Sequence, residues 1–180
     1  MKNYKKNFDL LKKNHVYSEE MEHDACGVGL IASTEGNKSR KVVEYGIEAL
    51  KAVWHRGAVD ADGKTGDGAG IHVEIPKDFF IEKIEVNGHT YDSSEICVGM
   101  IFLPRNDYAA QESCKTIVES ELTKNDFSIY GWRQVPVDPK VLGEKAFQTM
   151  PEIIQVLFKS NNPELLNKEL ERKIYETRRK

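Results

Sequence analysis

The stretch Cys26–Ala32, which reads Cys-Gly-Val-Gly-Leu-Ile-Ala, decides which fold to expect. Its apolar run predicts a buried strand over residues 27–33. Cys26 then stands at the mouth of a strand, beside glycines that leave the approaches to its thiol open. Because the thiolate is the nucleophilic form of cysteine, this stretch predicts a cysteine nucleophile held at the end of a sheet.

Two further motifs follow this stretch. The first is His55-Arg56-Gly57-Ala58, and the second is Thr65-Gly66-Asp67-Gly68-Ala69-Gly70-Ile71. In this order and spacing, the three pieces resemble the start of the glutaminase domain of glutamate synthases. That domain is a class II glutamine amidotransferase of the N-terminal-nucleophile type.

A later region strengthens this resemblance. It comprises residues 130–138, the pair Leu142-Gly143 and residues 150–155, and it is similar to the middle of the same domain. The shorter class II amidotransferases, such as asparagine and aminosugar synthases, are disfavoured by this string. The resemblance covers residues 22–180.

The resemblance implies a domain organisation and a fold. Residues 1–25 would be a propeptide, and residues 26–180 the front part of the amidotransferase domain. The fold would be the αββα sandwich of N-terminal-nucleophile hydrolases, present only in part. Periodicity alone predicts the α+β class.

The resemblance also implies that Cys26 is the catalytic residue, freed by cleavage after Ala25. A free α-amino group has a pKa of about 7.7–8.0 and can take the thiol proton, which an amide nitrogen cannot do. The thiolate would attack the side-chain amide of glutamine, release ammonia and leave a thioester for water to hydrolyse. We expect the oxyanion donors beyond Lys180, together with an arginine and an aspartate that bind glutamine. Asn87-Gly88 does not take the donor role, because this pair is predicted to form a hairpin turn.

Arg56 and Gly57 resemble the arginine-glycine pair that lies near the nucleophile of class II amidotransferases, at the substrate site, and helps to orient the cysteine end. A second interpretation of the same two residues stays open. Glycine suits the C-terminal cap of a helix, and a cation suits its last turn.

The resemblance places no cofactor in this segment but implies flavin mononucleotide and an iron–sulfur cluster elsewhere in a full-length synthase. Its partners would be glutamine, the remainder of the synthase chain and either a small reductase subunit or ferredoxin. The alternative function is a catalytically inert fragment or partner-binding module, because the oxyanion donors and substrate arginine are not found.

Composition excludes several classes of protein. The 180 residues carry a net charge of −3, which predicts neither nucleic acid nor a membrane surface as partner. No apolar run approaches a membrane span. Cys26, Cys97 and Cys114 do not form a disulfide framework, and the cytoplasm is the expected compartment.

Other motifs are weak. Gly63-Lys64-Thr65 lacks the upstream glycine of a phosphate-binding loop, since Ala58 stands there. His23 and Cys26 have no second ligand pair at zinc spacing, so no metal is expected. Cys97 is predicted to lie in the core, and packing is favoured for Trp132.

Secondary structure is predicted from periodicity and end signals. Ser39 caps a helix over residues 40–54, whose apolar positions should face a core. The other predicted helices cover residues 107–122 and residues 163–179, with a helical turn over residues 76–83. The predicted strands cover residues 27–33, 71–75, 96–103, 127–135 and 152–158, the last of which also permits a helix, and residues 84–91 are predicted to form a hairpin.

Overall fold

A computed structural model describes residues 6, 9–10, 13, 27–54 and 57–180. The chain divides into two compact units. The first comprises residues 1–58 and 68–71, and the second comprises residues 59–67 and 72–180. Helices and an antiparallel sheet occur together, so the predicted α+β class is confirmed.

The first unit contains helix α2 (Arg40–Ala52). The predicted cap is confirmed, because the Ser39 side chain accepts a hydrogen bond from the Lys41 backbone N–H at 3.2 Å. Val43, Ile47 and Leu50 are half-buried on one face, whereas Trp54 is exposed and follows the end of the helix. The helix therefore ends two residues earlier than predicted.

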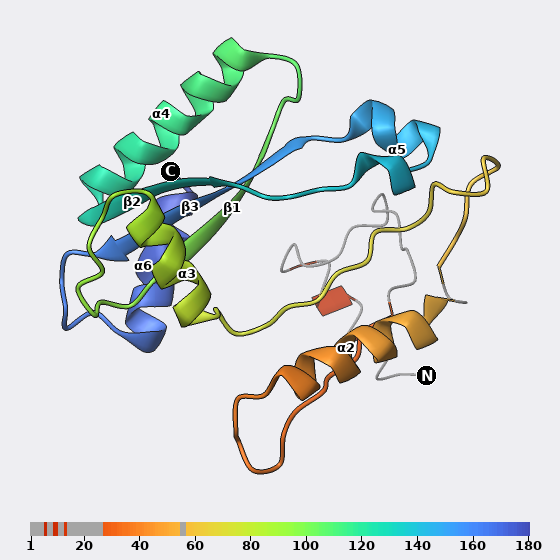
Figure 1. Cartoon of the computed structure of the whole chain (residues 1–180), viewed down its shortest axis with the longest axis horizontal. Helices are drawn as coiled ribbons and strands as arrows, with labels where there is room; N and C mark the ends of the chain where they lie inside the picture. The colour runs from red at the N-terminus through yellow and green to blue at the C-terminus, as the bar shows by residue number, and fades with distance from the viewer. Residues whose placement is uncertain (1–5, 7–8, 11–12, 14–26, 55–56) are drawn as a thin grey trace. The chain divides into compact units, whose positions relative to one another are not determined.

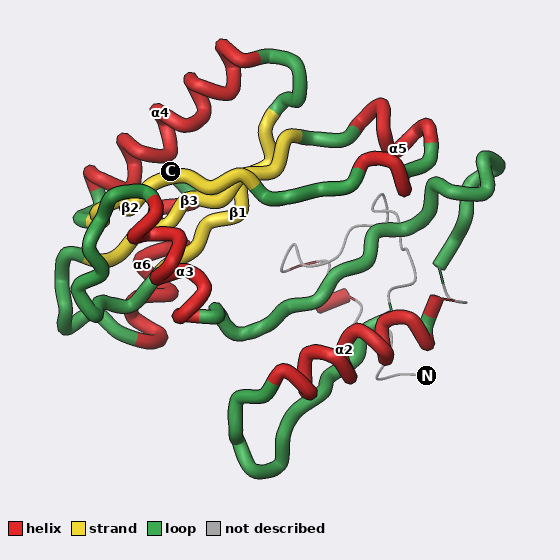
Figure 2. The backbone as a smooth tube through the Cα atoms, viewed as in Figure 1, coloured by secondary structure: helices red, strands yellow, loops and turns green. Residues whose placement is uncertain are grey.

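The second unit is built on a three-stranded sheet (Figures 1 and 2). Its strands are β1 (Cys97–Leu103), β2 (Phe127–Gln134) and β3 (Glu152–Ser160). β3 lies in the centre and pairs antiparallel with both neighbours. The three strands predicted for these stretches are thereby confirmed, and the helical alternative for residues 152–158 is wrong.

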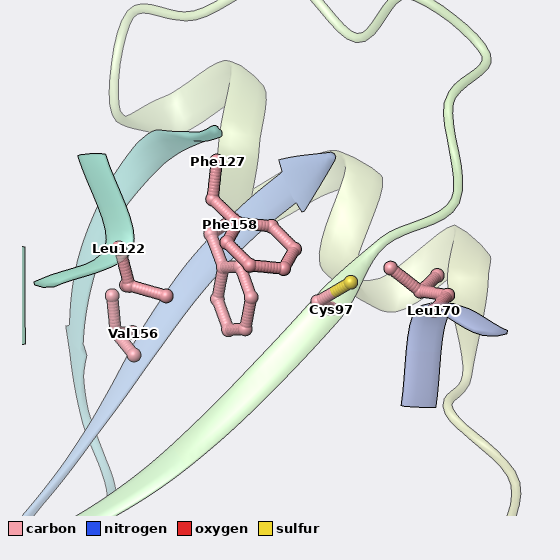
Figure 3. Close-up of a cluster of buried hydrophobic side chains, with 6 residues drawn as sticks. All are labelled: Cys97, Leu122, Phe127, Val156, Phe158 and Leu170. Atoms are coloured by element: carbon pink, nitrogen blue, oxygen red, sulfur yellow. The ribbon is translucent and has the colours of Figure 1, made fainter. Parts of the chain in front are cut away.

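Helices cover both faces of this sheet. α4 (Tyr108–Lys124) connects β1 to β2, and α6 (Asn167–Arg178) follows β3. With the sheet they enclose a cluster of Cys97, Leu122, Phe127, Val156, Phe158 and Leu170 (Figure 3). Since side chains alternate along a strand, Leu157 points to the opposite face, where it packs with Phe80 and Ile84 of α3 (Lys77–Val86).

Cys97 is a core residue, as predicted. Burial raises the pKa of its thiol to about 12. Trp132 is half-buried and packs against the cluster around Cys97, so its predicted packing role is confirmed. Its indole N–H donates to Glu119 of α4 at 2.6 Å.

Two predicted strands are wrong. Residues 27–33 and 71–75 form no strand. In the first stretch Val28 is 94% exposed and Leu30 is 89% exposed. A strand needs a neighbour to satisfy its backbone groups, and no described strand pairs with residues 27–33. An apolar pattern shows which side chains favour burial but does not supply the partner strand.

The predicted hairpin over residues 84–91 is also wrong. Residues 84–86 belong to α3, because Phe80 and Ile84 are four positions apart and bury together on the sheet. Asn87 and Gly88 end this helix: the Asn87 N–H donates to Lys83 O at 3.2 Å and the Gly88 N–H to Glu85 O at 2.9 Å. Gly88 has a φ of 82°, the left-handed conformation that favours glycine.

The last predicted helix begins later than expected. α6 starts at Asn167 and not at Pro163, because residues 162–165 form a turn in which the Leu165 N–H donates to Asn162 O at 3.2 Å. Between β2 and β3 lie a 3₁₀ helix, η2 (Pro139–Val141), and the short helix α5 (Glu144–Thr149). No helix among the described residues is long and apolar enough to cross a membrane.

Candidate functional site

Three residues carry the candidate site that the sequence predicts. Cys26 and Arg56 lie outside the residues that the structure describes, and so does nearly all of the expected propeptide. Gly57 is described: its N–H donates to Trp54 O at 3.0 Å in the turn that follows α2. A Cβ on Gly57 would lie 3.3 Å from that carbonyl oxygen, so the tight turn itself favours glycine here.

The loop over residues 59–67, which belongs to the second unit, has a defined structure. Val59 and Gly66 form an antiparallel bridge, and the Asp60 N–H donates to Thr65 O at 2.7 Å. The Asp62 carboxylate lies inside this turn. It accepts hydrogen bonds from the backbone N–H groups of Lys64 and Thr65 at 2.9 and 2.7 Å and from the Thr65 hydroxyl at 2.6 Å.

This loop packs against the Leu142-Gly143 motif, which lies far from it in the sequence. Gly143 is buried, and a Cβ added to it would lie 2.5 Å from the backbone nitrogen of Thr65. Nearby, the Lys145 ammonium donates to the Asp60 carboxylate at 2.5 Å. The Thr65–Ile71 and Leu142-Gly143 motifs thus meet in space at residues 62–65 and 143, a contact that the sequence did not predict.

The hydrogen bonds to Asp62 favour its charged form. The Thr65 hydroxyl is the largest cause, followed by the backbone N–H groups, and together they lower the pKa of Asp62 from 3.8 to about 2. Another of these N–H groups belongs to Glu144, the first residue of α5. One carboxylate therefore joins the loop to the start of α5.

The lowered pKa predicts a pH dependence of this contact. The folded value of about 2 lies below the ordinary value of 3.8, so the stabilisation is fully present above pH 3.8. It is lost as the pH falls from 3.8 to about 2. We expect the Asp62 carboxyl carbon to titrate near pH 2 by NMR.

A matched variant tests the cause of this shift. Thr65→Val keeps the shape of the side chain but removes the hydroxyl that donates to Asp62. We expect the midpoint of the Asp62 titration to rise toward 3.8 in this variant. An unchanged midpoint would show that the hydroxyl does not cause the shift.

No metal centre is formed by the part of the chain that the structure describes. Within it, no group of three or more His, Cys, Asp and Glu side chains is placed to hold a metal ion. Cys97 is buried in the core, and Cys114 lies in α4.

The comparisons with known proteins define the class. Residues 26–180 match the family model of the class-II glutamine amidotransferases. The chain therefore belongs to this family, and the predicted amidotransferase class of enzyme is confirmed.

The individual relatives that match this chain are glutamate synthases. The chain is 51% identical over 177 residues to the large chain of the NADPH glutamate synthase of Azospirillum brasilense, which covers 98% of the chain and 12% of the relative. It is 37% identical over 171 residues to the chloroplastic ferredoxin-dependent glutamate synthase 2 of Arabidopsis thaliana, covering 93% of the chain and 10% of the relative. The NADH glutamate synthase of Saccharomyces cerevisiae is 37% identical over 150 residues, covering 81% of the chain and 7% of the relative.

These matches confirm the resemblance to glutamate synthases that the motifs indicated. The chain spans about a tenth of the length of the curated relatives that it matches. The alternative of an inert or partner-binding module gains no support from any of them.

Proposed function

We propose that this chain is the glutaminase part of a glutamate synthase, which converts glutamine, 2-oxoglutarate and a reductant into two glutamates. The observation that carries the proposal is the family match, which begins at Cys26 and continues to Lys180. The identity of 51% to a glutamate synthase large chain supports the same assignment.

Cys26 is the nucleophile in this proposal. Residues 1–25 are a propeptide, and the start of the family match at residue 26 supports cleavage between Ala25 and Cys26. The freed α-amine has a pKa of about 7.7–8.0 and removes the proton of the thiol, directly or through water. The thiolate then attacks the amide carbon of glutamine, and the bond to nitrogen breaks as the protonated amine returns its proton to the leaving ammonia.

Water completes the reaction by hydrolysing the thioester to glutamate. Both steps pass through an oxyanion, which requires preorganised hydrogen-bond donors. The backbone N–H groups of Asn87 and Gly88 are already bonded to carbonyls of α3, which supports assigning the donors elsewhere. We assign these donors, and the groups that bind the amino-acid end of glutamine, to the remainder of a longer synthase chain.

Arg56 and Gly57 have supporting roles in this proposal. The Gly57 N–H donates to Trp54 O in a tight turn, and the proposed role of Arg56 and Gly57 is to help orient the cysteine end of the site. The earlier interpretation as a helix end is compatible with this role.

The ammonia is proposed to travel inside the full protein to a second site, where it aminates 2-oxoglutarate. Flavin mononucleotide and an iron–sulfur cluster belong to that part of the protein. The described residues of this segment do not fit a cluster, since Cys97 is buried in an apolar core and Cys114 lies on a different element. No step of the glutaminase reaction involves either group.

The electron donor and the compartment are further proposals. Relatives of this chain are named as NADPH, NADH or ferredoxin-dependent enzymes, so either a small reductase subunit or ferredoxin would deliver electrons to the rest of the synthase. We place the protein in the cytoplasm.

The N-terminus of the protein from its own cells tests the proposal. We expect mass spectrometry to find Cys26 as the first residue of a chain with a mass far above 20.5 kDa. A protein that retains residues 1–25 and still hydrolyses glutamine at a normal rate would contradict the role of the free α-amine.

A further inference from the structure

A polar hollow lies where the strands of the second unit end. It is open to solvent and has a volume of about 310 Å³, close to the smallest volumes of small-molecule pockets. Glu152 at the start of β3 pairs with Leu103 at the end of β1, and Gln134 at the end of β2 pairs with Ile154. The register of the sheet therefore gathers side chains of three strand ends around the hollow, and α4 closes one side.

Two cations line the hollow. The Arg105 guanidinium lies over the Phe147 ring, 4.4 Å from its centroid, and donates to Phe147 O at 3.4 Å. The hydrogen bond to Phe147 O uses one of the five N–H donors that a guanidinium carries. The second cation, Lys115, is paired with the exposed Glu112 at 2.8 Å, and such a surface pair is weak enough to be exchanged for a ligand.

The backbone beside Arg105 is fixed. The amide nitrogen of Gln111, a buried side chain of α4, donates to Pro104 O at 2.7 Å and to Arg105 O at 3.2 Å. These bonds hold the backbone of Arg105, and the contact with Phe147 places its guanidinium beside the hollow. A cation held in this way loses little freedom on binding.

One anion and an apolar surface complete the lining. Glu152 accepts a hydrogen bond from the amide of Gln134 through one carboxylate oxygen. Ile154 is 6% exposed and lines the hollow with the small apolar surface that remains accessible. The hollow thus presents two positive groups, one negative group and an aliphatic side chain, together with the uncharged polar side chains of Tyr108, Gln111 and Gln134.

We propose that this hollow binds a small acidic amino acid. Such a molecule carries two carboxylates, one ammonium and a short aliphatic chain, which is the reverse of the charges that line the hollow. The planar Arg105 fork suits bidentate binding of one carboxylate. Lys115 takes the other carboxylate, Glu152 takes the ammonium, and Ile154 contacts the methylene groups.

The hollow contains none of the residues proposed for glutamine hydrolysis, so binding there does not depend on that function. Glutamate is the product of the proposed reaction and can also occupy a glutaminase site. Variants of the residues that line the hollow therefore have to distinguish glutamate bound in the hollow from glutamate bound in the glutaminase site.

The test is isothermal titration of the natural-length protein carrying Cys26→Ala, with L-glutamate and with glutarate, which lacks the amine. We expect saturable binding of L-glutamate below about 10 mM and weaker binding of glutarate. Arg105→Met should weaken L-glutamate binding at least tenfold, and Arg105→Lys, which keeps the charge but loses the fork, should weaken it in part. Glu152→Gln should weaken L-glutamate alone, so that the preference over glutarate disappears.

Lys168→Met on the exposed start of α6 is the matched control and should bind like the parent protein. Thermal melting of each variant checks that it is folded. Two results would overturn the proposal. One is no saturable binding of L-glutamate, and the other is equal binding by a folded Arg105→Lys, Glu152→Gln and Lys168→Met, which would place the ligand elsewhere.

Discussion

Replacing Cys26 by Ala is expected to reduce glutamine hydrolysis by more than about 1,000-fold, because loss of a covalent nucleophile leaves only binding and oxyanion stabilisation. The measurement is release of ammonia and glutamate from glutamine by the natural-length protein. If the variant is folded and only its ammonia source is lost, ammonium added directly should still support glutamate formation from 2-oxoglutarate.

Cys114→Ser is the matched control for this experiment. Cys114 lies in α4 and is not one of the residues proposed for glutamine hydrolysis, so we expect near-normal hydrolysis from this variant. Cys97 is no substitute nucleophile, because burial raises the pKa of its thiol to about 12. Normal ammonia release from Cys26→Ala would refute the assignment of the nucleophile.

Replacing Gly143 by Ala is expected to destabilise the second unit by about 1–3 kcal/mol, the usual cost of overpacking. The new Cβ would stand 2.5 Å from the backbone nitrogen of Thr65. A backbone atom cannot rotate away as a side chain can, so the loop over residues 59–67 must move. The free energy of unfolding, measured in urea, gives the cost.

The control for this variant is Gly68→Ala, because no atom lies within 4 Å of a Cβ at Gly68. We also expect the pKa of Asp62 to rise toward 3.8 in Gly143→Ala, since displacement of the loop weakens the hydrogen bonds to its carboxylate. Equal stability of the two alanine variants would show that the loop is not held against Gly143.

The elements predicted correctly carry strong local signals. α2 begins after Ser39 and α4 begins after Asp107, whose side chains both accept hydrogen bonds from the first turn. β1 is an uninterrupted apolar run that ends before Pro104, and β2 is rich in the aromatic residues that favour strands. Propensity, capping and pattern agree in these segments, so the sequence is enough to define them.

The elements predicted wrongly depend on contacts that are distant in sequence. Residues 27–33 have a strand pattern, but hydrogen-bonded pairing requires a neighbour that the pattern cannot name. Asn87-Gly88 is a strong hairpin signal in isolation. It ends a helix because Phe80 and Ile84 bury together against Leu157 and Tyr130 of the sheet, and this burial outweighs the local turn preference.

The sequence by itself determined the α+β class, the sheet strands and the family, because motif order, periodicity and caps are properties of neighbouring residues. It also predicted the nucleophile, Cys26, through resemblance. Only the tertiary structure decided that Gly143 packs on the Asp62–Thr65 turn and that Arg105, Lys115 and Glu152 line one hollow. The physical reason is that strand pairing and reversal of the chain bring together residues that are far apart in the sequence. No pattern among neighbouring residues shows which of these distant residues will be in contact.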